Sequence, residues 1–483
     1  MRRFLPTLSL VGLFCLGFSL TLLLPMLVAL IYDEARELLG FVEIAVVIGL
    51  AGALLWLPGR NRVRDLQGRD GFLIVALFWF VLSLLGALPF MRLAGLSFVD
   101  ALFEAASGFT TTGSTVMHGL DALPRSFLFY RQYIQWLGGM GLIVLAVAVM
   151  PMLGIGGMGL YRAEAPGPMK EEKLAPRLAG TARILWSVYL GITLLCAIGY
   201  LFAGMDLFDA VAHSLSTVST GGFSPHDESL AWFHNPRVEL VAIVFMMLGA
   251  INFSVHYQAL HHADPRIYLR NVEVRVFLVL IAVVSLLMAV MLHMSGEYAE
   301  IGQSARYAVF EVVSVITSTG LGTVDFSQWP DFLPVLLIFI SFIGGCGGST
   351  AGGMKVMRVI LISLQGVREV RRLIHPRGIF PVRLEGRVIP DRTVESVWGF
   401  LAIYVFAFIV LMLLMMHTGM DQVSAFSAIA TCMNNLGPGL GAVSLSFADV
   451  SDAGKLVSVF AMILGRLEIF TVLVLLTPAY WRV

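Results

Sequence analysis

The sequence is poor in charged residues. Only 13% of its 483 residues are Asp, Glu, Lys or Arg, and the formal net charge is zero, whereas soluble globular domains are about 25% charged. No long acidic or basic tail is present, so the chain lacks the electrostatic footprint of a nucleic-acid-binding protein. A chain with so little charge is expected to lie in a lipid bilayer and not to bind nucleic acid.

Cysteine is also scarce. Cys15, Cys196, Cys346 and Cys432 stand far apart in apolar surroundings, and no CxxC pair occurs. This spacing supports neither a disulfide framework nor a structural zinc site. The segment GIGGMG at 154–159 formally matches GxGxxG. Because it follows a predicted membrane helix and not a strand, a helix exit is favoured over a nucleotide contact.

Apolar sequence is abundant. Hydrophobic residues make up 58% of the chain, the mean hydropathy is +0.85, and runs of about 20 apolar residues can cross the hydrocarbon core as helices. The first run is too long for a signal peptide and has no cleavage site where one is expected. Ten spans are predicted, at about 4–30, 38–57, 72–95, 133–152, 182–204, 238–260, 275–295, 333–365, 396–417 and 456–478.

Lysine and arginine are distributed unevenly between the loops. Most of the 32 lie in one alternate set of loops, above all at 162–183 and 355–392, while the opposite loops carry acids such as Asp206, Asp209 and Asp325. Basic loops stay on the cytoplasmic side of a membrane. Both termini are therefore predicted to be cytoplasmic, as an even number of spans permits.

A segment of one kind recurs in four outer connections. The four copies read LFEAASGFTTTGST from Leu102, LFDAVAHSLSTVSTGGFS from Leu207, VFEVVSVITSTGLGT from Val309 and AFSAIATCMNNLGPG from Ala425. Each runs through two or three turns of helix-compatible sequence and breaks at glycine, and fourfold recurrence indicates a repeat architecture. The breaks align as Thr111-Thr112-Gly113, Thr220-Gly221-Gly222, Ser318-Thr319-Gly320 and Asn435-Leu436-Gly437.

The repeat predicts an all-α polytopic membrane protein. Each unit is a helix, a pore half-helix, a filter loop and a second helix, and four units surround one central ion pore. Irregular backbone at membrane depth must be buried in protein or line a watery cavity, and rings of peptide carbonyls can replace the water around a monovalent cation. The predicted divisions are an N-terminal helix pair at 1–70 and repeats at 71–178, 179–272, 273–392 and 393–483.

These repeats, the N-terminal pair and the segment GGCGGSTAGG at 344–353 resemble the Trk/Ktr/HKT superfamily of potassium transporters, most closely the membrane subunits of bacterial Trk systems (the TrkH/TrkG type). The resemblance implies that the four aligned triplets bind K⁺ and that the chain lies in the bacterial inner membrane as a homodimer. It also implies a cytosolic, RCK-type, TrkA-like regulatory subunit that binds NAD or ATP, for which the basic segment from Val367 offers a docking surface. Anionic lipid headgroups are the alternative partner for these charges.

Residues 344–353 are predicted to form a gate. Each interior glycine costs a helix about 1 kcal/mol relative to alanine, so this stretch is expected to unwind just inside the filter and to lie across the ion path. The gate comprises Gly344, Gly345, Cys346, Gly347, Gly348, Ser349, Thr350, Ala351, Gly352 and Gly353. A close helix-packing face is the alternative for this stretch, but that would require small residues spaced by four.

Arg466 is the second predicted gating element. It lies within a predicted span, where an arginine costs about 2.5 to 3.5 kcal/mol and marks a functional site. The other repeats carry Gly139, Ala250 and Gly345 in the same register. We expect its guanidinium to bond carbonyls of the gating loop and to oppose cation passage, a role that the resemblance also implies.

Other functions remain open from the residues alone. The glycine loops could be simple turns, and the transported ion could be sodium or ammonium, or be coupled to protons or sodium in a symporter. His213 beside Ser214, and Gly347-Gly348-Ser349, allow an intramembrane hydrolase. Such an enzyme would need a base within hydrogen-bond reach of its serine, and its chemistry would not explain four repeats.

Overall fold

The computed structural model describes residues 5–58, 70–144, 178–330 and 332–467, together with 469, 472, 474, 475 and 477–481. These residues are mostly helical. The one sheet among them is an antiparallel pair in which Arg383 lies opposite Val388 and Leu384 opposite Arg387, formed by β1 (Arg383–Leu384) and β2 (Arg387–Val388). The segment GIGGMG and the end of the span predicted at 133–152 lie outside the described residues.

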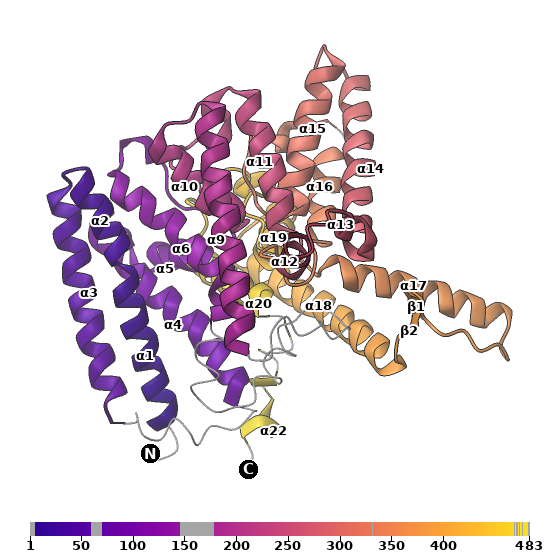
Figure 1. Ribbon diagram of the computed structural model, residues 1–483, viewed down its shortest axis with the longest axis horizontal. Coiled ribbons are helices and arrows are strands. Elements are labelled where there is room, and N and C mark those ends of the chain that lie inside the picture. The colour runs from indigo at the N-terminus through magenta and orange to yellow at the C-terminus, as the bar shows by residue number, and fades with distance from the viewer. Residues whose placement is uncertain are drawn as a thin grey trace.

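Three helices precede the repeats and form one side of the molecule (Figure 1). They are α1 (Leu5–Thr21), α2 (Leu23–Ile31) and α3 (Ala35–Trp56). Helices α1 and α3 pack closely because small residues face each other: a Cβ on Gly12 would lie 2.7 Å from the carbonyl oxygen of Gly52. Small residues of this kind let membrane helices approach each other.

Each of the four repeats begins with a long helix followed by a short one. The long helices are α4 (Asp70–Leu93), α9 (Leu178–Ala203), α14 (Val272–Met294) and α18 (Asp391–His417), and the short ones are α5 (Phe98–Phe109), α10 (Leu207–Val218), α15 (Ile301–Ile316) and α19 (Gln422–Asn434). With 12 to 16 residues, the short helices fall below the roughly 20 needed to cross a bilayer. They match the predicted half-helices.

Polar side chains fix where three of the half-helices begin. Ser97, Asp206 and Asp421 each accept a hydrogen bond from a backbone N–H of the first turn of α5, α10 and α19, respectively. Such caps satisfy donors that have no partner within the helix. The half-helices therefore start at defined residues of the outer loops.

A second helix closes each repeat. These helices are α6 (Arg125–Val144), α11 (Pro236–Gly249), α16 (Leu333–Ser341) and α20 (Asp452–Arg466). The remaining elements are the 19-residue helix α17 (Val356–Ile374) and the shorter η2 (Leu120–Ala122), η4 (Ser229–Phe233), η5 (Phe326–Gln328), η6 (Gly441–Val443), α12 (Phe253–His261), α13 (Arg266–Arg270) and α22 (Pro478–Trp481).

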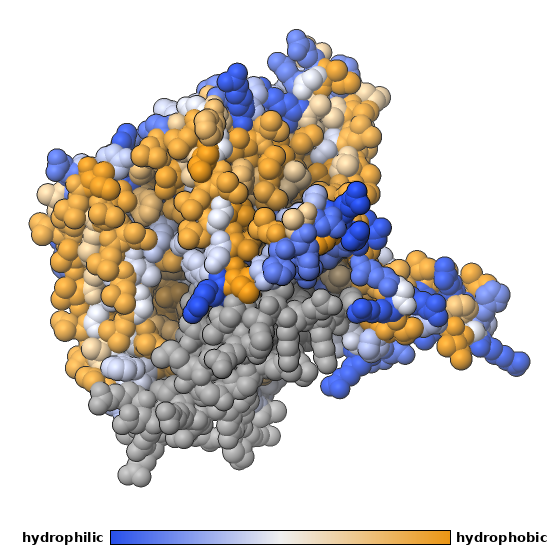
Figure 2. All heavy atoms as spheres, viewed as in Figure 1, coloured by the Kyte–Doolittle hydropathy of each residue, from blue (hydrophilic) through white to orange (hydrophobic). Residues whose placement is uncertain are grey.

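Six described helices are long and apolar enough to span a membrane: Thr7–Ile31, Ala35–Trp56, Phe72–Leu93, Arg183–Ala203, Val272–Met294 and Asp391–His417. A seventh candidate is the pair α11 and α12, which is bent by 97°. Figure 2 agrees with a membrane location, because hydrophobic residues cover the upright helices while hydrophilic residues gather at their upper ends and around α13 and α17.

The span predicted at 238–260 is not the continuous helix that its apolar sequence suggests. It breaks after Gly249, because the carbonyl oxygen of Ala250 accepts a bond from the N–H of Cys346 and the N–H of Phe253 donates to Gly348. The break predicted within 333–365 is present: α16 ends at Ser341 and α17 begins at Val356. The two interruptions are thus bonded to each other.

The apolar core forms two large clusters of buried side chains, and a small third cluster joins α17, the β1–β2 hairpin and the start of α18. One joins the N-terminal helices to α5 and α20, and the other includes α9, α14 and α15. Helices α10 and α19 contribute to both clusters, so the half-helices tie the two halves together. Helix α17, the β1–β2 hairpin and the start of α18 project from this body (Figure 1), whereas Phe400, Tyr404 and Leu411 of α18 are buried in the first cluster.

Candidate functional site

The four half-helices end in one repeated backbone conformation. Each is followed by a residue other than glycine with a left-handed φ of 52° to 54°, namely Thr111, Thr220, Ser318 and Asn435. Two residues further on, each chain has a glycine with φ between 76° and 105°, namely Gly113, Gly222, Gly320 and Gly437. The triplets aligned from the sequence are therefore structurally equivalent, and we refer to them as filter loops 1 to 4.

Hydrogen bonds explain how this conformation is held. In filter loop 1 the N–H of Thr112 donates to the carbonyl of Ser107 at 2.8 Å, and the N–H of Thr111 donates to Gly108 at 3.0 Å. This is the Schellman pattern, which usually has glycine at its left-handed position. A residue with a side chain there stores about 1 to 3 kcal/mol of strain, and such strain is typical of functional sites.

The four filter loops close into a ring. A Cβ added to the glycine of each loop would collide with the carbonyl oxygen of the middle residue of the next loop: Gly113 with Gly221, Gly222 with Thr319, Gly320 with Leu436, and Gly437 with Thr112. The order of contacts runs from loop 1 through loops 2, 3 and 4 and returns to loop 1. Four segments from 111–113, 220–222, 318–320 and 435–437 thus meet around one axis.

This ring has the chemistry of a cation site. Peptide oxygens are hard neutral ligands that can replace the hydration shell of a monovalent cation. Each half-helix ends at the ring, and a helix C-terminus carries about half a negative charge. Thr111, Thr220, Ser318 and Asn435 are all at most 1% exposed, so the ring lies in the interior of the protein.

Helices that follow the half-helices approach the filter loops through glycine. A Cβ on Gly138 or Gly465 would collide with the carbonyl oxygen of Phe109 or Met433, two residues before the left-handed position. A Cβ on Gly249 would likewise lie 2.8 Å from the carbonyl oxygen of Val218. The third repeat departs from this pattern, because α16 has already ended at Ser341.

The loop at 344–353 lies directly against the filter loops. The N–H of Gly352 donates to the hydroxyl of Ser318, and a Cβ on Gly352 would collide with the carbonyl oxygen of Asn434. The hydroxyl of Thr350 lies 3.2 Å from that of Thr220. Filter loops 2, 3 and 4 are therefore in contact with this loop.

The rest of the loop is fixed from the side of α11 and α14. The Thr350 hydroxyl donates to the carbonyls of Val218 at 3.1 Å and Gly249 at 3.0 Å. The carboxylate of Glu273 accepts bonds from the N–H of Gly347 at 2.8 Å and of Met357 at 3.1 Å. The unwound stretch is consequently an ordered loop with defined partners.

Arg466, at the end of α20, reaches this loop. Its guanidinium donates to the carbonyl of Thr350 at 2.8 Å and, more weakly, to those of Gly138 at 3.3 Å and Gly139 at 3.5 Å. It also lies 5.7 Å from the ring centroid of Trp79. The sequence register predicted the contact between Arg466 and the loop; its effect on ion passage stays a prediction.

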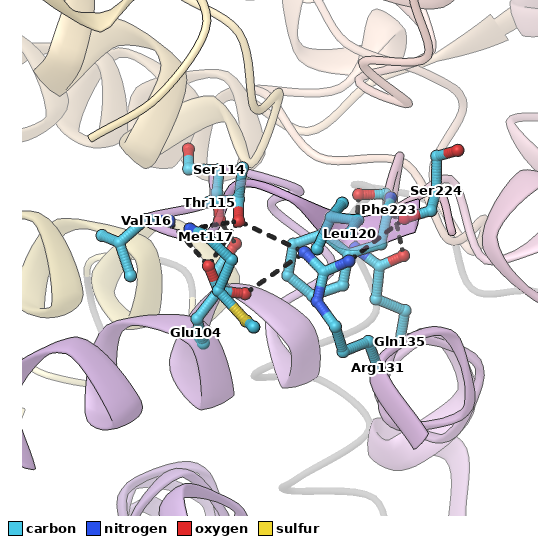
Figure 3. Close-up of polar contacts among 12 residues, drawn as sticks. Glu104, Ser114, Thr115, Val116, Met117, Leu120, Arg131, Gln135, Phe223 and Ser224 are labelled. Atoms are coloured by element: carbon cyan, nitrogen blue, oxygen red, sulfur yellow. Dashed lines mark hydrogen bonds and ion pairs between the residues drawn. The ribbon is translucent and has the colours of Figure 1, made fainter. Parts of the chain in front are cut away.

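A buried ion pair behind the filter loops was not predicted from the sequence. Arg131 is 1% exposed, and its guanidinium contacts Glu104 at 3.4 Å, the hydroxyl of Thr115 at 3.2 Å and the carbonyl of Ser224 at 3.1 Å (Figure 3). Glu104 also accepts the N–H of Val116 at 2.6 Å. The pair therefore connects the segments that follow filter loops 1 and 2, after Gly113 and Gly222.

A group of ionisable side chains joins the outer connections of the first two repeats. His226 contacts Asp121 at 2.5 Å and Asp209 at 3.2 Å. Burial lowers the pKa of His226, but the hydrogen bonds to Asp209 and Asp121 outweigh it, so the net pKa is raised above its ordinary value of 6.5. The raised pKa favours the protonated ring, which can bridge the two carboxylates.

The residues considered for hydrolysis have structural partners. The hydroxyl of Ser214 donates to the carbonyl of Val211 at 2.8 Å, and that of Ser349 donates to Cys346 at 2.6 Å. His213 contacts the carbonyl of Asp209 and the hydroxyl of Ser224, not Ser214. Neither predicted serine is paired with a histidine base by these contacts.

Comparison with known proteins agrees with the fold and the repeats. Residues 40–482 match a family described as TrkH, cation transport protein. The fold and the site thus define a polytopic membrane transport protein and not an enzyme. Because the match covers most of the chain, this protein belongs to the TrkH family.

Individual relatives are similar over almost their whole length. The chain is 48% identical to the Trk system potassium uptake protein TrkH of Vibrio parahaemolyticus, over 99% of this chain and 100% of that protein. It is 45% identical to TrkH of Escherichia coli, over 98% of both, and 40% identical to the E. coli Trk system potassium uptake protein TrkG, over 96% of both. The crystal structure of the potassium transporter TrkH from V. parahaemolyticus superposes with a TM-score of 0.91 at 46% identity, covering 99% of this chain and 100% of that one.

Proposed function

We propose that this protein carries potassium ions into the cell across the cytoplasmic membrane, through a filter of backbone carbonyls contributed by filter loops 1 to 4. The observation that supports this most is the closed ring of contacts from Gly113 through Gly222 and Gly320 to Gly437. The relatives that cover the whole chain are named potassium uptake proteins. The repeat divisions predicted from the sequence, at 71–178, 179–272, 273–392 and 393–483, supply one filter loop each.

In this proposal the loop at 344–353 is the gate and Arg466 holds it in place. The loop lies beside the filter because the N–H of Gly352 donates to the hydroxyl of Ser318, and the hydroxyl of Thr220 donates to that of Thr350. A guanidinium bonded to the Thr350 carbonyl adds a positive charge there, and a fixed positive charge raises the barrier to a passing cation. Opening would require the loop to leave these partners.

Orientation and partners follow from the charge pattern and from the relatives. Both termini are proposed to be cytoplasmic, because the basic loops then face the cytoplasm. The relatives are named as parts of a Trk system, which agrees with control by a cytosolic RCK-type subunit that binds NAD or ATP. The basic segment from Val367, which begins within α17, is the proposed docking surface. Two copies of the chain are proposed to form a homodimer with one pore each.

Isotope uptake into proteoliposomes tests the transport proposal. The purified chain is expected to take up potassium and rubidium faster than sodium. The Gly222→Ala variant is the control, because its added methyl group collides with the carbonyl of Thr319 at a φ of 81°, and it is expected to lose uptake. Uptake that requires a sodium or proton gradient would support a coupled symporter, and equal uptake by the variant would contradict the filter.

A further inference from the structure

Filter loop 2 differs from filter loops 1 and 3 in the side-chain hydrogen bonds that hold it. The middle residue of loops 1 and 3 is a threonine, and its hydroxyl lies 2.7 Å from a second threonine hydroxyl: Thr112 pairs with Thr110, and Thr319 with Thr317. In loop 2 the middle residue is Gly221, which has no side chain to make this bond. Its neighbour in the register of Thr110 is Ser219, whose hydroxyl donates to the carbonyl of Ser216.

A second restraint is also altered in loop 2. In loops 1 and 3 a serine six residues before the glycine donates to the carbonyl just after that glycine, from Ser107 to Ser114 and from Ser314 to Leu321, both at 2.6 Å. The corresponding Ser216 donates instead to the side-chain oxygen of Gln135 at 3.0 Å. Loop 2 therefore lacks both of the internal restraints that hold loops 1 and 3.

Gln135 of α6 occupies the place of these missing restraints. Its amide nitrogen donates to the carbonyl of Gly221 at 2.6 Å, and its amide oxygen accepts the N–H of Phe223 at 3.0 Å (Figure 3). The side chain is completely buried. A Cβ on Gly221 would lie 2.5 Å from the Gln135 side-chain carbon, so the amide fills the space of the side chain that loop 2 lacks.

We infer that Gln135 is a positioning residue for ion selection. From its place in the first repeat, it restrains loop 2 in the way that loops 1 and 3 are restrained by their own side chains. This inference rests on the proposed filter. Two consecutive glycines give loop 2 more backbone freedom than the other loops. Without the amide, its carbonyls can shift toward a smaller ion, and discrimination between potassium and sodium falls.

The pairing of Gln135 with Gly221 allows a reciprocal test. Gly221 does not have a left-handed φ in this structure, so a threonine is compatible with its backbone. In the double variant Gln135→Ala, Gly221→Thr, the new hydroxyl can pair with Ser219 as Thr112 pairs with Thr110. The Gly221→Thr change alone would collide with Gln135.

The experiment compares rubidium and sodium isotope uptake into proteoliposomes. Gln135→Ala is expected to lower the rubidium-to-sodium ratio at least about fivefold, the factor that corresponds to one hydrogen bond of ordinary strength. The double variant is expected to regain most of the ratio, and Gly221→Thr alone to lose uptake of both ions. Gln132→Ala is the matched control: it lies one turn earlier on α6, and no described residue hydrogen-bonds its amide.

The outcomes separate the inference from the proposed function. If Gln135→Ala does not fold, Gln135→Met keeps the length of the side chain without the amide and should show the same loss of ratio. If the parent is selective and the Gln135 variants keep its rubidium-to-sodium uptake ratio, the inference is overturned but the proposed filter is not. The same holds if the double variant is no more selective than Gln135→Ala. A parent without preference for rubidium overturns both.

Discussion

Replacing Arg466 with alanine is predicted to increase potassium uptake. Its guanidinium donates to the carbonyl of Thr350 at 2.8 Å, which is the length of a charge-assisted hydrogen bond. Such a bond contributes about 1.5 to 3 kcal/mol. The bonds to Gly138 and Gly139, at 3.3 and 3.5 Å, are too long to add much.

The magnitude follows from how the loop at 344–353 is otherwise held. If the bond to Thr350 stabilises only the closed loop, its loss favours the open loop by about tenfold to 150-fold, because 1.4 kcal/mol corresponds to a factor of ten. The Thr350 hydroxyl keeps its bonds to Val218 and Gly249, so the loop is not fully released. An increase near tenfold in the rate of uptake is therefore expected.

Rubidium uptake into proteoliposomes, without any regulatory subunit, measures this effect. Arg466→Lys keeps the charge but not the guanidinium geometry, and should give a smaller increase. Arg92→Ala serves as the control, since the Arg92–Glu43 pair is exposed and exposed pairs contribute at most about 1 kcal/mol. Uptake that is unchanged or lower in folded Arg466→Ala would refute the assigned role.

Three further predictions concern the filter and its supports. Gly113→Ala places a methyl group at a φ of 83° against a neighbouring filter loop and should abolish uptake, whereas Gly302→Ala, with open space around it, should not. Arg131→Met leaves Glu104 buried without its cation and should lower the free energy of unfolding by about 3 to 5 kcal/mol, measured by thermal unfolding in detergent; adding Glu104→Gln should recover part of it. The pKa of His226 is raised in the folded protein, so its bridge should stabilise the fold below pH 6.5 and lose this effect as the pH rises through the raised pKa. The difference in melting temperature between the parent and His226→Gln should then shrink with rising pH; a constant difference would argue against the bridge.

The sequence was sufficient for the repeat because the determining interactions are local. A half-helix that ends with a left-handed residue and a glycine two positions later leaves a pattern within about fifteen residues, as in the segment from Leu102. The same holds for the loop at 344–353, where the clustered glycines predict an unwound backbone. The all-helical fold with its half-helices is confirmed, while ion binding at the filter loops stays a prediction.

Features that depend on distant partners were not predicted. The bend between α11 and α12 falls within an apolar run and is stabilised by bonds from Cys346 and Gly348, nearly a hundred residues away. Glu104 and Arg131 each look like an ordinary charge of the outer region until the fold buries them together. The amide of Gln135 has meaning only beside Gly221, in another repeat.

Anomalous X-ray scattering from crystals of the protein grown in rubidium tests the central claim most directly. The account predicts rubidium peaks on the axis enclosed by Gly113, Gly222, Gly320 and Gly437, and predicts that potassium displaces them at lower concentration than sodium. Peaks found only elsewhere in the protein, with none inside this ring, would contradict the assignment of the four loops as the ion path.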